Sequence, residues 1–136
     1  MLNPSDINDM LQRLWPQANV KCLEVSETQA LAGCDVQEGD YRPGNFIAGP
    51  TQFAMADSAV WFLVNGALGR LEPMTVTSEL SIRFLRPAKG DKLYARAHLE
   101  RRGTTSVVAT VRVFTHDEAA PTAVAQATYA LPQSVR

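Results

Sequence analysis

The sequence predicts an α+β fold in which an antiparallel sheet of about six strands wraps around one long central helix, with a short helix at the N-terminus. The stretch Gly49–Gly69 reads as a helix that is apolar nearly all the way round. Six other segments alternate apolar and polar residues or are rich in small and β-branched ones, as strands are. Because a helix apolar on every side needs burial on every side, we expect the sheet to curl around it.

The segments before the long helix are short. Residues Pro4–Trp15 carry apolar side chains at helical spacing, and Pro16 is expected to end that helix. Two strand-like runs, Val20–Val25 and Ala30–Val36, are separated by the polar stretch "SETQ", which predicts a hairpin. The stretch "QEGDYRPGNFIAG" is polar and rich in glycine, so we expect an irregular loop that leads into the long helix.

Four strand candidates follow the long helix: Thr75–Leu85, Leu93–Arg102, Thr104–Thr115 and Thr122–Leu131. The connections "RPAKGD", "RRG" and "HDEAAP" are too short for crossover helices, so the sheet should be antiparallel. Strict alternation in the first candidate predicts two faces, an apolar one with Val76, Leu80, Ile82 and Phe84 and a polar one with Thr75, Thr77, Glu79, Ser81 and Arg83.

Composition limits the class of protein. The 136 residues, 46% of them hydrophobic, are enough for one globular domain, expected over residues 1–136. The 13 basic and 14 acidic residues give a formal net charge of −1 without a basic run, so we expect no nucleic-acid partner. No secretory signal pattern and no apolar run of ~18 residues occurs, which predicts a cytoplasmic protein with no membrane contact.

The two cysteines, Cys22 and Cys34, lie in strand-like segments and form no CxxC motif. This spacing supports neither a disulfide framework nor a zinc site. We therefore expect buried free thiols and no bound metal.

The long helix contains one carboxylate, Asp57. The residues one turn away are Phe53, Ala54, Val60 and Trp61, so no polar stripe surrounds it. Burying an ionised carboxylate is costly unless it is paired or hydrogen-bonded. Two interpretations stay open: Asp57 lies on a solvated edge or caps a backbone group, or it is a catalytic base or nucleophile in an apolar site.

The start of the same helix is a second candidate feature. Gly49 and Pro50 form an ordinary helix start, but they also leave the N–H groups of Gly49 and Thr51 pointing outward at the positive end of the helix dipole. Such donors suit an oxyanion. At a rise of ~1.5 Å per residue, Gly49 and Asp57 lie roughly 12 Å apart, so one carbonyl group cannot contact both within one chain.

A second copy of the chain satisfies both requirements. A partner would bury the flank of the helix that the sheet leaves open. Two such helices packed antiparallel about a two-fold axis would bring Asp57 of one chain beside Gly49 of the other. We therefore expect a homodimer, and the sequence leaves open whether dimers pair into tetramers.

From about Val20 to Leu131 the chain resembles the hotdog-fold thioesterases, in particular the phenylacetate-degradation type and its 4-hydroxybenzoyl-CoA relatives. The resemblance is carried by the loop "RPGNFIAGP", the helix motif "FAMADSA" and the strand ending "SIRFLRPAKGD". It implies that Asp57 activates water or attacks the thioester directly, while the amide of Gly49 from the partner chain polarises the carbonyl group. Those families typically open the helix with His-Gly-Gly, whereas this chain has Ala48 and Pro50 at the first and third positions.

The resemblance also suggests further site residues. Asn45 is a candidate catalytic residue that would orient water or the thioester. Candidate substrate-binding residues are Thr51 at the helix start, Trp61 for the acyl group, and Arg83 and Arg86 for the phosphates of coenzyme A. A core position for Trp61 and plain solvation for the two arginines are the competing interpretations.

The function expected from these features is hydrolysis of a small or medium acyl-CoA, with coenzyme A as part of the substrate and no further cofactor. Two alternatives remain. One is a hotdog hydratase or dehydratase, whose chemistry usually needs a histidine that Ala48 replaces here. The other is a non-catalytic acyl-CoA-binding protein that keeps the fold.

Overall fold

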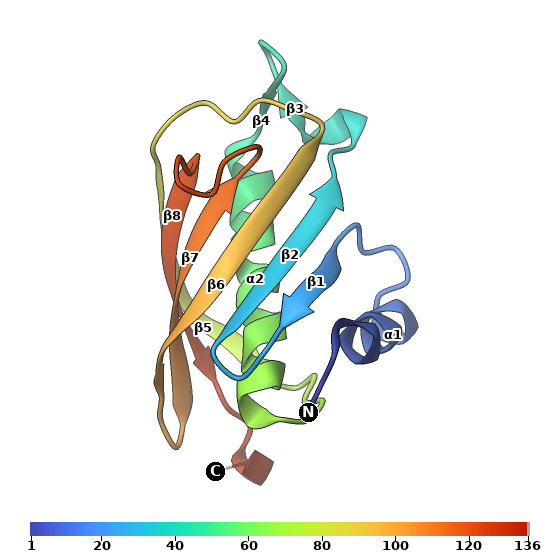
Figure 1. The fold of residues 1–136 in the computed structure, drawn as a ribbon, viewed down its shortest axis with the longest axis vertical. Helices are drawn as coiled ribbons and strands as arrows, with labels where there is room; N and C mark the ends of the chain where they lie inside the picture. Colours follow the sequence, from blue (N-terminus) through green and yellow to red (C-terminus); the bar gives the residue numbers. More distant parts are fainter. Residues whose placement is uncertain (136) are drawn as a thin grey trace.

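In the computed structural model, which describes residues 1–135, a six-stranded antiparallel sheet wraps around one long helix, as predicted (Figure 1). The helices are α1 (Pro4–Leu14) and α2 (Gly49–Leu68), with 3-10 turns at Glu38–Asp40 and Gln133–Val135. The strands of the main sheet are β1 (Lys21–Val25), β2 (Gln29–Asp35), β5 (Val76–Phe84), β6 (Lys92–Arg102), β7 (Ser106–Phe114) and β8 (Ala123–Ala130). This is the hotdog arrangement that the resemblance implied.

The strand order is β1-β2-β6-β7-β8-β5. The hairpins β1–β2, β6–β7 and β7–β8 join strands that are neighbours in sequence. The connection "RPAKGD" is different, because it leaves β5 at one edge beside β8 and crosses to β6 in the middle of the sheet (Figure 1). The short length of this connection excluded a crossover helix, but it did not show that β5 would pair with β8 rather than with β6.

Helix α2 packs against all six strands of the main sheet. Its side chains Val60, Phe62, Leu63 and Val64 are fully buried. It ends at Gly69, whose left-handed φ of 72° lets its N–H reach the carbonyls of the last turn. One flank of α2 remains outside this packing, and Phe53 on that flank is 40% exposed.

The predicted irregular loop before α2 contains more structure than expected. It has the 3-10 turn and a small hairpin of β3 (Tyr41–Arg42) and β4 (Phe46–Ile47). At the tip, Gly44 and Asn45 have φ values of 90° and 61°. Glycine and asparagine tolerate this left-handed conformation, so the residues that suggested an irregular loop are the ones that make a tight turn possible.

The strict alternation predicted for the first strand after α2 is wrong at its start. A register shift in the β5–β8 pairing lies between Thr77 and Glu79, so Ser78 is an extra residue in β5. Beyond this bulge, Leu80 and Ile82 face the core as predicted. Before it, Thr77 pairs with the buried Tyr129 and faces α2, because one inserted residue reverses the face of every side chain on one side of it.

The two edges of the sheet are finished differently. Helix α1 lies beside β1 (Figure 1), and the side-chain amide of Asn8 donates to the carbonyl of Cys22 at 2.9 Å and accepts from its N–H at 2.8 Å. At the other edge, β5 exposes Val76 by 58% and Phe84 by 52%. Neither helix in residues 1–135 is long and apolar enough to cross a membrane.

Candidate active site

Asp57 lies on the open flank of α2 and is half-buried. Its Oδ1 atom accepts two hydrogen bonds, one from the hydroxyl of Thr77 at 2.6 Å and one from the hydroxyl of Tyr129 at 2.6 Å. Within residues 1–135, no hydrogen bond or ion pair involves Oδ2 of Asp57. The carboxylate therefore has one held oxygen and one available oxygen.

Tyr129 is 2% exposed and also approaches the main-chain oxygen of Asp57, at 2.9 Å. Burial raises the pKa of Tyr129 well above its usual range, and the hydrogen bond to Asp57 raises it further, while a hydrogen bond with Thr77 opposes them. The phenol thus stays protonated and remains a hydrogen-bond donor to the carboxylate throughout the neutral range.

A cavity of about 550 Å³ opens beside Asp57. Most of its lining is apolar and comes from α1, α2 and both edges of the sheet: Leu11, Trp15, Ala18, Val20, Trp61, Pro73 and Val76. Among residues 1–135, Asp57 is the one charged residue in this lining. The rings of Trp15 and Trp61 meet edge to face with centroids 5.8 Å apart, which places the predicted residue Trp61 in the cavity wall.

A second cavity, of about 440 Å³, follows the first two turns of α2. It shares Val20 and Ser58 with the first cavity, so the two are adjacent along the same flank of the helix. Thr51 lines this second cavity, and its hydroxyl donates to Asp40 Oδ1 at 3.2 Å. The structure thus places Thr51 on the same flank as Asp57 but in the neighbouring cavity.

The start of α2 is uncapped, in contrast to the start of α1. Helix α1 begins with a complete capping box in which Asn3 and Asp6 satisfy each other's backbone N–H groups. Ala48 offers α2 no side-chain cap, and no hydrogen bond of the described chain uses the amides of Gly49 or Thr51. These N–H groups are therefore free donors at the positive end of the dipole of a 20-residue helix.

Phe84, at the end of β5, lies against the start of α2. A methyl group added to Gly49 would come within 3.1 Å of Phe84 Cζ, which shows how closely strand and helix approach there. Thr77, near the start of β5, contacts Asp57 two turns further along α2. Strand β5 therefore runs alongside α2, with its first residues at Asp57 and its last at Gly49. Within one protomer these two candidate catalytic groups lie at different turns of the helix.

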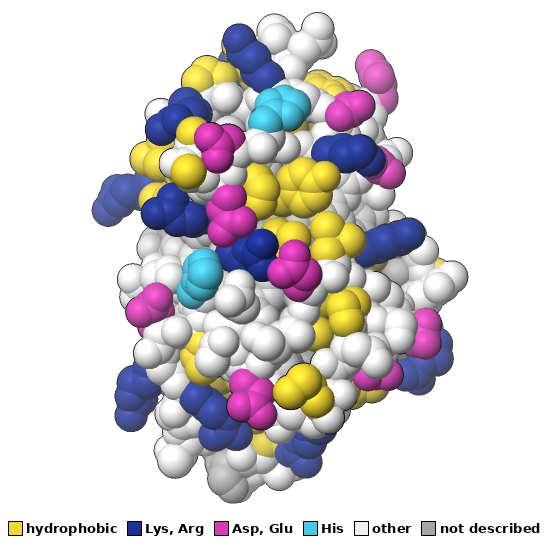
Figure 2. Space-filling model, in the orientation of Figure 1, with side chains coloured by type: hydrophobic (Ala, Val, Ile, Leu, Met, Phe, Trp, Pro, Cys, Tyr) yellow, Lys and Arg dark blue, Asp and Glu magenta, His cyan; other side chains and the backbone are white. Residues whose placement is uncertain are grey.

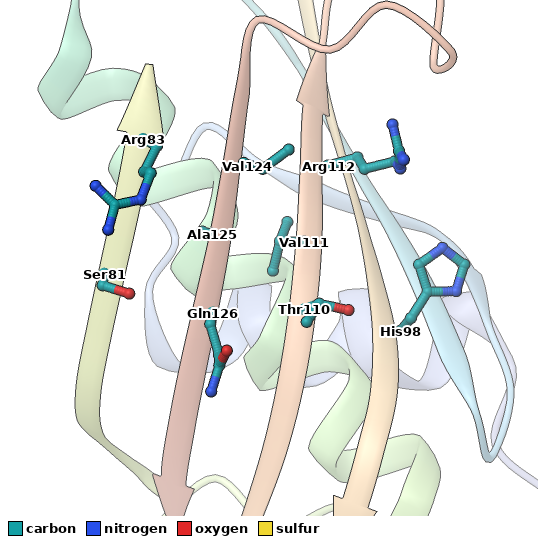
Figure 3. Close-up of a pocket in the computed structure, with 9 residues that line it drawn as sticks. All are labelled: Ser81, Arg83, His98, Thr110, Val111, Arg112, Val124, Ala125 and Gln126. Carbon is teal, nitrogen blue, oxygen red and sulfur yellow. The ribbon is translucent and has the colours of Figure 1, made fainter. Parts of the chain in front are cut away.

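The remaining predicted residues lie away from Asp57. Asn45 is exposed at the tip of the β3–β4 hairpin, where its left-handed φ accounts for an asparagine. Arg86 is exposed two residues beyond Phe84, on the side where α2 begins. Arg83 projects from β5 at the rim of a shallow hollow on the outer face of the sheet, opposite α2, with its guanidinium turned away from the strands that line the rest of the hollow (Figure 3).

The outer hollow has a volume of about 430 Å³ and is polar, with His98, Thr110, Arg112 and Gln126 around it (Figure 3). Over the whole outer face, acidic and basic side chains are interspersed (Figure 2). Arg96, for example, pairs with Glu24 at 2.9 Å and with Glu118 at 3.3 Å. The described chain also contains no group of three or more His, Cys, Asp or Glu side chains placed to hold a metal ion.

Three residues of the site are not predicted from the sequence: Trp15, Thr77 and Tyr129. Thr77 was assigned to the outer face because strict alternation overlooks the bulge at Ser78. Tyr129 lies 72 residues from Asp57 along the chain, so only the pairing of β5 with β8 brings it close. Trp15 lies at the end of α1, whose position on the sheet the sequence does not reveal.

Comparison with known proteins shows the family and the fold of the chain. The family model described as "Thioesterase superfamily" matches residues 44–122, which is more than half of the chain. A proposed thioesterase from Silicibacter sp. TM1040 is 30% identical, with 97% of this chain and 93% of that chain covered and a TM-score of 0.84. Among curated proteins, none is similar enough in sequence to match the chain.

Two more distant solved structures share the fold. A thioesterase from Haemophilus influenzae is 18% identical, with 96% of this chain and 90% of that chain covered and a TM-score of 0.80. A mutant of a phenylacetic acid degradation protein from Thermus thermophilus is 17% identical, with 91% and 99% covered and a TM-score of 0.71.

Proposed function

The chain belongs to the thioesterase superfamily, and we propose that it hydrolyses the thioester of a small or medium acyl-CoA, with coenzyme A as part of the substrate and no other cofactor. The observation that carries this proposal is the placement of Asp57. Among the described residues it is the one charged side chain that lines a mostly apolar cavity, and its Oδ2 is available to act. A carboxylate in such a position suits attack on a carbonyl group, either directly or through water.

In this reaction the thioester C–S bond breaks and coenzyme A leaves as the thiol. Asp57 either takes a proton from the water that attacks the carbonyl carbon, or attacks that carbon itself to form an anhydride that water then hydrolyses. Both routes place negative charge on the carbonyl oxygen, where free backbone N–H groups stabilise it. The uncapped amide of Gly49 fits that role.

The open edge of β5 supports a homodimer that completes the site. If two β5 strands pair antiparallel about a two-fold axis near Leu80 and Ser81, Thr77 of one protomer faces Phe84 of its partner. Since Thr77 contacts Asp57 and Phe84 contacts Gly49, this pairing brings Asp57 close to the partner's Gly49. Each dimer then has two equivalent sites. Further pairing of dimers, like the cytoplasmic location, remains a prediction from sequence.

The cavity lining favours an apolar, uncharged acyl group. Trp15 and Trp61 form its aromatic wall, and none of the described lysines or arginines lines it to meet a second carboxylate on the acyl chain. Arg86 lies on the side of α2 where coenzyme A phosphates would approach the partner's site. Arg83 is directed to the opposite face of the sheet, so in the proposed dimer a phosphate contact with Arg83 would require the nucleotide to reach around the ends of the paired β5 strands.

Purified protein assayed against a panel of acyl-CoA thioesters tests the proposal. Asp57→Asn keeps the size of the side chain and should lower kcat by about 100-fold or more, as expected for loss of a general base or nucleophile. Asp35→Asn is the matched control, because Asp35 is an exposed carboxylate paired with Lys92 on the outer face at 2.6 Å.

Three other results would contradict the proposal. Hydrolysis that survives Asp57→Asn removes the assigned role of the carboxylate. Hydration of an enoyl-CoA would instead favour the hydratase, and binding of coenzyme A without turnover of any thioester would favour the non-catalytic binder. Asn45→Ala and Thr51→Val in the same assay decide whether those residues act on the substrate or only shape the loop and the helix start.

A further inference from the structure

We propose that Tyr129 is a positioning residue for the reaction: its hydroxyl, together with that of Thr77, fixes Oδ1 of Asp57 so that Oδ2 is always the oxygen presented to the substrate. This inference rests on the proposed function of Asp57. It adds a residue from β8, outside the helix that carries Asp57. The Tyr129 hydroxyl acts on the reaction through the carboxylate of Asp57.

The first support is that only one of the two carboxylate oxygens of Asp57 accepts hydrogen bonds from the described chain. Oδ1 accepts two hydrogen bonds of 2.6 Å, a length typical of strong bonds between a hydroxyl group and a charged oxygen. In the part of the chain that the structure describes, Oδ2 accepts none. A carboxylate with no such anchors would exchange its oxygens by rotation about χ2, which is a soft torsion. Two donors on one oxygen stop this exchange.

The second support is how the fold brings the two donors together. Thr77 and Tyr129 are direct cross-strand partners in the β5–β8 ladder. They share a face because the bulge at Ser78 turns Thr77 inward, whereas without the extra residue Thr77 would lie on the outer face. β-Bulges often re-aim a side chain next to an active site, and here the bulge produces the donor pair.

The third support is the contact of Tyr129 with the helix backbone. Its hydroxyl lies 2.9 Å from the main-chain oxygen of Asp57 as well as 2.6 Å from Oδ1. The ring is 2% exposed, so the surrounding core holds it in place. Tyr129 therefore sets the position of the helical turn that carries Asp57 and the orientation of its carboxylate at the same time.

The test compares Tyr129→Phe with the wild-type enzyme on the thioester that the wild type hydrolyses best. We expect kcat to fall by about 10- to 100-fold, the range for a hydrogen bond to a charged group. KM should change little, because Tyr129 lines the cavity with a ring that is only 2% exposed, and the substitution removes only the hydroxyl that contacts Asp57. Tyr41→Phe is the matched control, since it removes a tyrosine hydroxyl that donates to Gly90 O at 2.8 Å, away from Asp57. Its kcat should stay within about twofold of the wild type.

A conservative replacement separates positioning from general support of the core. 3-Fluorotyrosine introduced at position 129 keeps the hydroxyl donor and should restore kcat to near the wild-type value. A Tyr129→Phe enzyme that melts at a lower temperature but keeps its kcat would overturn the proposal, because Tyr129 would then be only structural.

A signal independent of activity covers the case in which Tyr129→Phe does not fold. In the folded wild type, the Tyr129 hydroxyl proton should give a slowly exchanging NMR signal that shifts in Asp57→Asn. If the chemical shift of the signal is the same in Asp57→Asn as in the wild type, Tyr129 does not contact Asp57 and the proposal fails. If instead the wild type hydrolyses no thioester, the proposed function fails, and the hydroxyl signal still reports whether Tyr129 holds Asp57.

Discussion

The two edge strands of the main sheet, β1 and β5, differ in whether another part of the described chain covers their outer side. At β1, the side chain of Asn8 on α1 occupies both the N–H and the carbonyl of Cys22, as a further strand would. At β5, nine residues form an edge that exposes apolar side chains such as Val76 and Phe84. No element of residues 1–135 other than β8 pairs with β5.

This difference supports the proposed pairing of two chains at β5. An unpaired edge is a template for pairing with another chain, and proteins usually cover or interrupt such edges. The chain covers β1 with its N-terminal helix and leaves β5 open. Because β5 also contacts Asp57 at one end and Gly49 at the other, the open edge is the one that lies beside the proposed catalytic groups of α2.

The largest expected effect comes from blocking the open edge. Ser81→Arg places two like charges beside the proposed two-fold axis and should convert a dimer to a monomer. Since each site then lacks the partner's oxyanion donor, kcat/KM should fall by about 100-fold or more. Light scattering measures the mass and the acyl-CoA assay the activity.

Lys21→Glu is the control for that experiment, because it changes a charge at the covered edge and should leave both the mass and the activity as they are. A Ser81→Arg protein that is monomeric and fully active would show that the site lies within one protomer. In that case the open edge of β5 would have no part in the reaction.

A smaller effect should follow from uncovering the β1 edge. Asn8→Ala leaves the N–H and carbonyl of Cys22 without their partner, which should cost roughly 1–3 kcal/mol of unfolding free energy and lower Tm by roughly 3–10 °C. Calorimetry measures this, and activity per folded molecule should be unchanged. Asn19→Ala is the control, since Asn19 makes one exposed bond to Asp35 O. Equal losses in the two variants would argue against a special role of Asn8.

The smallest expected effect at neutral pH concerns the thiols of Cys22 in β1 and Cys34 in β2, which change the stability only at alkaline pH. Burial raises the pKa of Cys22 to about 12 and that of Cys34 to about 11, from an ordinary value of 9.0. A thiol with a raised pKa in the folded state stabilises the protein fully below pH 9, and this contribution is lost as the pH rises toward 11 or 12. Urea titrations should therefore show a falling unfolding free energy above pH 9.

Replacing the more buried thiol isolates its share of this pH dependence. Cys22→Ala should flatten the alkaline decline, because a methyl group does not titrate. If the slope above pH 9 is the same in Cys22→Ala and the wild type, the buried thiol is not its source. A reagent that labels thiolates should likewise react slowly with native protein at pH 8.

Much of the fold was predictable because its signals are local. Helical spacing located α1, and a long run of apolar residues located α2. Period-two alternation, or runs of β-branched and small residues, located all six strands of the main sheet close to their observed bounds. The lone carboxylate in an apolar helix made Asp57 a candidate, and the glycine-proline start made Gly49 one, whose amide has no hydrogen bond within residues 1–135. Each of these signals lies within about two helical turns of sequence.

The features that could not be predicted depend on pairing between distant segments. The edge position of β5 follows from how the sheet closes around α2, and the bulge at Ser78 is visible only in the β5–β8 register. The contact of Tyr129 with Asp57 results from both. Sequence alternation assumes an unbroken period of two, so it assigned Thr77 to the wrong face.

The sequence by itself determined the two helices, the strands of the main sheet and the choice of Asp57 as the candidate acid, because each depends on the pattern of side chains along one element. Only the tertiary structure decided which hydroxyls hold that acid, which oxygen stays available and which edge stays open. The physical reason is that a hydrogen bond requires atoms to meet within about 3 Å, and the meeting of residues 57, 77 and 129 is set by strand order and by one inserted residue rather than by any local pattern.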